Sequence, residues 1–335
     1  MRALPLVAIL LGLAAMAALV AYFGAGAVVH SLAAVGWAGF ASVCLIHVTM
    51  MALMGVAWHA LLPKSSVRLL IWGRFVRDAG SEVLPLSQVG GYVLGTRALA
   101  IGGIGAARAT ASTIVDVTVE FIAQLTYTAI ALGWLVHLRP SAEIALPTAI
   151  GLGVAAAGAA IFVLLQRHGM RFFDRSARLL GRGWADRTAA GAGALHGELE
   201  GIYRRRTGLW TSLFVHLGCW IASATEPWIA LRFAGVNLPF AAVMVIESLL
   251  YATRSVAFVM PNAVGVQEAA YVLLGGTFGL TPEMALALSL VKRARDLAIG
   301  LPTIALWQVH EGGRLWRRHA AARAIVAAEK PPLQE

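Results

Sequence analysis

Residues Met260 to Ala270 read MPNAVGVQEAA. This segment places a Pro, an Asn, a Gly, a Gln and a Glu in a region that is otherwise apolar enough to lie in a bilayer, where each unpaired polar group costs several kcal/mol. A plain membrane-spanning helix is therefore not expected here. The segment instead predicts a broken or re-entrant helix that lines a cavity, since transporter folds build binding sites near the bilayer midplane in this way.

A similar order of residues occurs earlier in the chain. Arg77 is followed by Leu84-Pro85 and then by Gly90 and Gly91, as Arg254 is followed by Met260-Pro261 and then by Gly265. The repetition suggests that one structural plan is used twice, which predicts two related halves.

The composition places the chain in a membrane. Hydrophobic residues make up 59% of the sequence and charged residues 13%, whereas an average soluble domain is roughly 25% charged. The formal net charge of +10 comes from basic residues in loops and in the C-terminal tail. The positive-inside rule explains that placement, so no nucleic-acid partner is expected.

Apolar runs predict an all-α polytopic fold. The clear spans are 4–23, 37–62, 110–137, 145–166, 209–234, 239–259 and 282–308, and two weaker segments interrupted by Pro and Gly are 83–105 and 260–280. The first run follows Arg2 and precedes Ala25-Gly26-Ala27, so a cleaved signal peptide is the alternative to a retained first helix. A retained helix fits better because the run is long enough to span the bilayer.

Loop charges predict the orientation. The segment 63–80 carries Lys and Arg, while 24–36 carries no charged residue, so the N-terminus is expected to be cytoplasmic. Nine Arg in the connector 167–206 and further Arg in the tail 311–335 place both of these inside as well. An even number of crossings then favours about eight transmembrane helices, in which 260–280 crosses and 83–105 is re-entrant.

The chain is thus expected to be one integral membrane domain, residues 1–310, followed by the tail. Its halves are 1–166 and 207–310, and the connector joins them on the cytoplasmic side. Basic residues at helical spacing in the connector fit a helix lying on anionic lipid. A solvated connector that merely obeys the positive-inside rule is the alternative.

Ionisable residues inside apolar segments are the candidate site. Asp116 and Glu120 share one face of a helix, which is expected to look into a polar cavity or toward cationic partners. Glu247 and Arg254 lie two turns apart and are expected to pair. Lys292 and Asp296 are an i, i+4 pair with Arg295 beside them and Arg293 turned away. Arg77 and Arg97 lie near the first interrupted segment. Such residues mark a binding site by default, although pairs that only hold the bundle together are the alternative.

The interrupted segments complete the candidate site, through Pro85, Gly90 and Gly91 in the first and Pro261, Asn262, Gly265 and Glu268 in the second. Asn262 is expected to cap a helix that begins just after it. The positive end of that helix and the nearby Arg residues would form an anion-attracting pocket, in which Glu268 neutralises a basic neighbour while the site is empty. The alternative is an ordinary loop at Pro261, with Glu268 in interfacial water.

Motifs for other chemistry are absent. The sequence has no HExxH, CxxC, phosphate-binding Gly loop or GxSxG. His30, His47, His59 and His216 show no metal-ligand spacing, so no metal and no cofactor are predicted. Cys44 and Cys219 both lie in apolar runs and are expected to pack.

The segments Leu84-Pro85 to Gly90-Gly91 and Pro261 to Glu268, together with the charged helix at Lys292 to Asp296, resemble the flippase-like transmembrane domain of the lysylphosphatidylglycerol synthase family. The resemblance is strongest to its hopanoid-biosynthesis-associated members of HpnL type. It implies a multi-pass protein of the bacterial inner membrane that handles a lipid head group. The soluble aminoacyl-transferase domain of two-domain members is not found, so lysine transfer is not carried over.

Two functions from different classes follow. A translocator would bind an anionic phospholipid or a hopanoid head group through the basic residues and leave the apolar part of the lipid in the bilayer. A membrane enzyme would instead use Asp116, Glu120, Glu247 or Glu268 as an acid or base, but no nucleophile with a base at defined spacing is visible. The translocator is therefore favoured, and an accessory protein in a complex with other lipid-synthesis membrane proteins remains a third possibility.

Overall fold

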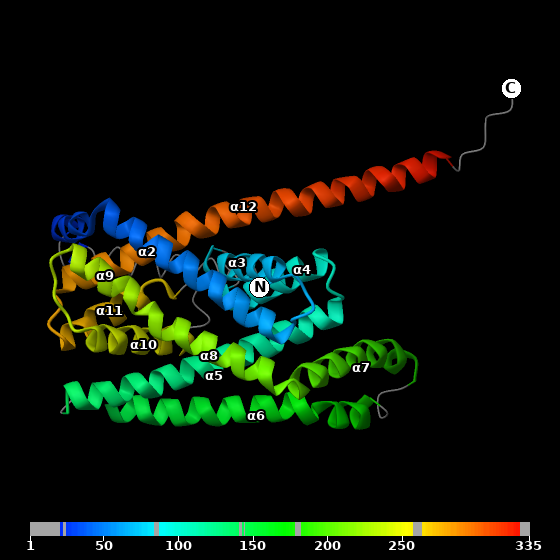
Figure 1. Cartoon of the computed structure of the whole chain (residues 1–335), viewed down its shortest axis with the longest axis horizontal. Coiled ribbons are helices and arrows are strands. Elements are labelled where there is room, and N and C mark those ends of the chain that lie inside the picture. The colour runs from blue at the N-terminus through cyan, green and yellow to red at the C-terminus, as the bar shows by residue number, and fades with distance from the viewer. Residues whose placement is uncertain are drawn as a thin grey trace.

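Figure 1 shows a computed structural model of the chain. It describes residues 21–22, 25–83, 87–140, 143, 145–177, 182–256 and 263–328, without the side chains of 83, 87–88, 145, 165–190, 256 and 312–328. These residues form helices joined by short turns, with no strand among them, which confirms the all-α fold.

The first part of the chain forms five helices, which are α2 (Ala25–Leu61), α3 (Val67–Val83), α4 (Ser87–Ile101), α5 (Ala106–Leu138) and α6 (Ala145–Ala177). The second part forms α7 (Arg182–Arg204), α8 (Arg206–Ser223), α9 (Thr225–Phe233), α10 (Phe240–Val256), α11 (Val266–Thr277) and α12 (Pro282–Ala328). In Figure 1 the α6 and α7 helices lie along one side of the bundle, and α12 runs along the opposite side and extends beyond it. With 47 residues, α12 is about 70 Å long.

Two units of helix, break and helix appear in the fold. The α3 and α4 helices flank residues 84–86, and α10 and α11 flank residues 257–265. Each unit is followed by a long helix, α5 in the first case and α12 in the second. Residues 84–86 and 257–262, which include Pro85, Pro261 and Asn262, lie outside the described residues. The close packing of Gly91 of α4 against Ser81 of α3 shows that the chain turns back between these two helices, and Gly265 caps the start of α11.

Two segments that were expected to be loops are helical. Most of 24–36 belongs to α2, which bends at Gly36, where φ is 64°, a conformation that suits only Gly. Most of 63–80 forms α3. Arg74 and Arg77 interrupt the apolar pattern there, but both are buried and ion-paired, so they drop out of the loop-charge count that oriented the N-terminus.

Charged side chains lie inside the bundle and apolar side chains outside it. Arg74, Glu247 and Arg295 are at most 4% exposed. Large apolar side chains such as Trp37, Leu273 and Val309 are more than 70% exposed. A soluble monomer seldom shows this arrangement, whereas a bundle surrounded by lipid requires it.

Three described helical stretches are long and apolar enough to cross a membrane, namely Ala25–Leu61, Ala106–Leu138 and Leu146–Leu164. The predicted span 209–234 is divided at Ala224 into α8 and α9. The predicted span 282–308 lies within α12, which carries four ionisable residues between Lys292 and Asp296. Eight crossings are therefore not established by helix length and composition.

Candidate functional site

A cavity of about 340 Å³ lies inside the bundle, between α2, α3, α5, α8, α9, α10 and α12. Four basic and four acidic side chains line it. They are Arg74, Arg77, Arg254 and Arg295, and Asp78, Glu82, Glu120 and Glu226. Formal charges of the two kinds are equal in number, with His47 in addition. The volume lies at the lower end of the range for small-molecule sites, about 300–1,000 Å³.

The α3 and α5 helices form the first charged cluster. Arg74 donates to both carboxylate oxygens of Glu120, at 2.7 and 3.0 Å, and to Asp78 at 2.6 Å. Arg77 donates to Asp116 at 2.6 Å and also to Glu120. The sequence predicted that Asp116 and Glu120 face cationic partners, which is confirmed, and the partners lie on a helix that was expected to be a loop.

The α10, α11 and α12 helices form a second cluster. Lys292 Nζ lies 2.5 Å from Glu247 Oε2, and the hydroxyl of Tyr271 donates to the other oxygen of the same carboxylate. Glu247 was expected to pair with Arg254, and Lys292 with Asp296. Both expectations are replaced by this contact between helices, because sequence spacing detects only neighbours on one helix. The Arg254 guanidinium lies 5.7 Å from the ring centre of Tyr251, at the cavity wall.

A third cluster is centred on Arg295 and links α9, α12 and α2. Arg295 donates to Glu226 through Nη1 and to Oδ1 of Asp296 through both Nε and Nη2, at 2.9 and 2.5 Å. The second oxygen of Glu226 lies 3.0 Å from Nδ1 of His47. Arg295 and Asp296 are thus neighbours in the chain and partners in space.

Glu268 fixes the start of α11. The Glu268 carboxylate accepts hydrogen bonds from the N–H of Gly265 at 2.7 Å, from Nε of Arg293 at 2.5 Å and from the hydroxyl of Ser289 at 2.9 Å. The helix begins at Val266, three residues later than expected, because Gly265, with φ of 84°, occupies the cap position. Arg293 pairs with Glu268 and is therefore the basic neighbour that this carboxylate neutralises, and it does not line the cavity.

The remaining predicted site residues have other positions. Gly91 packs α4 against α3, because a Cβ there would collide with the Ser81 hydroxyl and the carbonyl oxygen of Arg77. Gly90 is half-buried on the same helix. Arg97 has a side chain that is 50% exposed, pairs with Glu311 and does not line the cavity. Pro85, Pro261 and Asn262 lie outside the described residues.

Several lining residues were not predicted as site residues, among them His47, Arg74, Asp78, Glu82 and Glu226. A general signal was available, since an ionisable side chain between apolar residues of a membrane helix marks a site by default. Arg74 and Asp78 were missed because their segment, 63–80, was expected to be a cytoplasmic loop, and Glu82 was missed because it lies between that loop and the interrupted segment 83–105.

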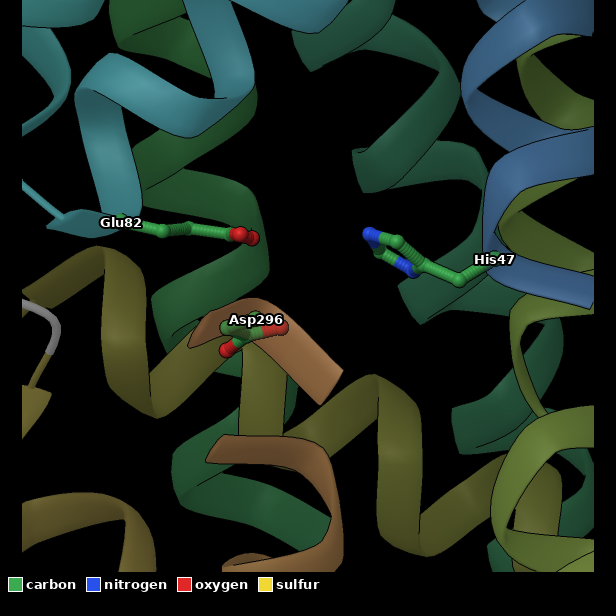
Figure 2. Close-up of side chains that lie close together, drawn as sticks. All are labelled: His47, Glu82 and Asp296. Atoms are coloured by element: carbon green, nitrogen blue, oxygen red, sulfur yellow. The ribbon is translucent and has the colours of Figure 1, made fainter. Parts of the chain in front are cut away.

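One group of side chains has the composition of a metal site. The ligand atoms of His47, Glu82 and Asp296 all lie within 4.8 Å of one another (Figure 2). The sequence predicted no metal site because ligand spacing was sought along the chain. These three residues come from α2, α3 and α12, so no spacing rule would join them.

Comparison with known proteins places the chain in a family. A family model described as the lysylphosphatidylglycerol synthase TM region matches residues 6–302, which include every charged cluster described above. No curated protein and no solved structure gives a match. With its apolar helices and buried charges, this chain is a multi-pass membrane protein that belongs to the lysylphosphatidylglycerol synthase TM family.

Proposed function

We propose that the chain is a lipid translocator that handles the head group of a hopanoid or a phospholipid in the bacterial inner membrane, without ATPase activity. The observation that carries this proposal is the charged cavity inside a bundle whose outer surface is apolar. A volume of about 340 Å³ suits a head group, while the acyl or polycyclic part of the lipid remains in the bilayer.

The cavity offers hydrogen-bond donors to a head group. Among the described residues, Nε1 of Trp220 and Nε of Arg77 are buried donors without a partner, and both residues line the cavity. Arg74, Arg77 and Arg295 are each paired with carboxylates. This balance supports a hydroxylated or zwitterionic head group better than a simple anion, since an anion would compete with carboxylates already in place.

The two units of helix, break and helix suggest how the cavity opens to each side. In our proposal they are the moving parts of two related halves with about eight crossings, and both termini and the connector 167–206 are cytoplasmic. A head group that enters would exchange one ion pair for another and so avoid leaving a charge unpaired in the membrane. Other lipid-synthesis membrane proteins would supply or receive the lipid.

The alternative is a membrane enzyme or an accessory subunit of lipid modification. Its candidate acids and bases were Asp116, Glu120, Glu247 and Glu268. Each of these carboxylates is held in an ion pair with an Arg or a Lys, so it could reach a substrate only by breaking that contact. The structure therefore gives the translocator the better support.

Proteoliposomes provide the test. Purified protein would be reconstituted into vesicles with lipids whose head groups carry a reporter. The fraction of the labelled lipid that is accessible from outside the vesicles would then be followed over time. We expect faster equilibration between leaflets than in protein-free vesicles, and a loss of this activity in Arg254→Gln, which alters the cavity wall. Arg97→Gln removes the same charge outside the cavity and should retain the activity.

Wild-type vesicles that equilibrate no faster than protein-free vesicles would refute translocation. Mass spectrometry of the same lipids distinguishes a translocator from an enzyme, since an enzyme would change the mass of the head group. In cells, a deletion strain should keep its total lipid composition and change only the distribution between leaflets.

A further inference from the structure

We infer that His47, Glu82 and Asp296 bind a divalent transition-metal ion at the cavity wall. The three side chains come from α2, α3 and α12 and converge on one space, with their ligand atoms within 4.8 Å of one another. Figure 2 shows the His47 ring directed toward the Glu82 carboxylate, with Asp296 beside the gap between them.

The partner of His47 fixes which ring nitrogen is available. Nδ1 lies 3.0 Å from Oε1 of Glu226, whose other oxygen accepts a hydrogen bond from Arg295. An ionised carboxylate can only accept, so Nδ1 carries the proton and Nε2 presents a lone pair. A carboxylate behind a His is the usual support of a metal-binding imidazole, because it orients the ring and strengthens its donor nitrogen.

The two carboxylate ligands also have free oxygens. Both Arg295 donors to Asp296 bond Oδ1, so Oδ2 accepts no hydrogen bond from the described residues. Glu82 is half-buried, and its carboxylate has no hydrogen bond or ion pair with any described residue. Three ligand atoms of suitable type therefore meet without hydrogen-bond partners among the described residues.

Local charge favours a cation. Glu82, Asp296 and Glu226 bring three acidic side chains to this place, and Arg295 is the direct positive partner of Asp296 and Glu226. Lys292 is neutralised by Glu247. Arg254 lines the same cavity and opposes a cation, so removal of its charge should strengthen binding.

The ligand set indicates the class of metal. One imidazole nitrogen and two carboxylate oxygens suit Zn²⁺ and the other divalent first-row ions Mn²⁺, Fe²⁺ and Co²⁺. At metal–ligand distances of about 2.0–2.2 Å, the ligand atoms of a tetrahedral site lie roughly 3.5 Å from one another. The ligand atoms of His47, Glu82 and Asp296, now within 4.8 Å of one another, would therefore have to move about 1 Å closer together when the metal binds. Three protein ligands leave a position open toward the cavity, where an oxygen of a head group could bind. That last step rests on the proposed function, whereas metal binding itself does not.

The test is metal binding by the purified full-length chain in nanodiscs, after removal of bound metal with a chelator. Co²⁺ would be titrated while its visible absorption is recorded, and Zn²⁺ binding would be measured by competition. We expect stoichiometric binding that is at least tenfold weaker in Glu82→Gln and in His47→Gln, and several-fold tighter in Arg254→Gln. His30→Gln, which removes an exposed His from the same helix, should bind as the wild type does.

Glu82→Gln is the decisive variant, because it keeps the side-chain shape and breaks no contact within the described residues. Absence of stoichiometric Co²⁺ binding, or equal affinity in Glu82→Gln and wild type, would overturn the site. The lipid assay is read separately. Metal binding without lipid movement would refute the proposed function and leave the site standing, and lipid movement without metal binding would do the reverse.

Discussion

Glu247 of α10 and Lys292 of α12 form a buried ion pair with a 2.5 Å contact, and the pair formed by Arg77 of α3 and Asp116 of α5 corresponds to it. In each unit, the helix before the break is tied to the long helix that follows the helical hairpin. The signs are reversed, since the first unit has the cation before the break and the second has the anion there. The correspondence is between helices rather than between residues, because the repeated order in the sequence matches Arg77 with Arg254 and not with Glu247.

The first prediction concerns this pair. Lys292→Ala leaves Glu247 buried without its cation and should cost about 3–5 kcal/mol of stability. The double change Glu247→Leu with Lys292→Met should recover most of that loss, because no buried charge is left alone. Thermal unfolding of the purified variants would measure both, and a double variant as unstable as the single one would contradict the pairing.

A second prediction concerns the contact between α3 and α4. Gly91→Ala should destabilise the protein by about 1–3 kcal/mol, because the added methyl group meets the backbone of Arg77 and pushes the hairpin apart. Gly133→Ala on α5 is the matched control. No atom lies within 4 Å of its new Cβ, so it should be neutral or stabilising by about 1 kcal/mol. Equal effects of the two substitutions would show that α4 does not pack in this way.

A third prediction separates Glu268 from the cavity. Its carboxylate holds the start of α11 and pairs with Arg293, so Glu268→Ala should lower stability by about 1–3 kcal/mol. Lipid movement per folded molecule should change less than in Arg254→Gln. A Glu268→Ala protein with full stability and no lipid movement would instead place Glu268 in the lipid site, as the sequence alone suggested.

The fourth prediction is the orientation of the chain. Single Cys residues introduced at Arg187 and Gln334, in a background with Cys44 and Cys219 replaced, should react only with reagents that reach the cytoplasm. Loop charges in the connector and the tail supply the reason. Labelling of either position from the periplasm would refute the arrangement with both termini inside.

Composition and local pattern were enough for the class of fold. Apolar runs with few charges can only be helices in lipid, so the sequence alone predicted an all-α membrane protein. Pro and Gly cannot continue a helix without loss of hydrogen bonds or stability, and the reversal between α3 and α4 and the Gly265 cap of α11 lie where the sequence placed the interruptions. Short motifs in the same places carried the family resemblance, which the match over residues 6–302 confirms.

The partners of the charges were decided by the tertiary structure alone. Spacing along one helix suggested Glu247 with Arg254 and Lys292 with Asp296, but Glu247 meets Lys292 and Asp296 meets Arg295. The same holds for His47, Glu82 and Asp296, which three separate helices bring together. A buried charge is stabilised by whichever opposite charge the packing brings within a few ångströms, and helix packing is not encoded in the spacing along any one helix. For this reason the sequence determined the class of fold and that charges lie inside the bundle, and only the packing of α2, α3, α5, α9, α10 and α12 decided which of those charges line the cavity and how they pair.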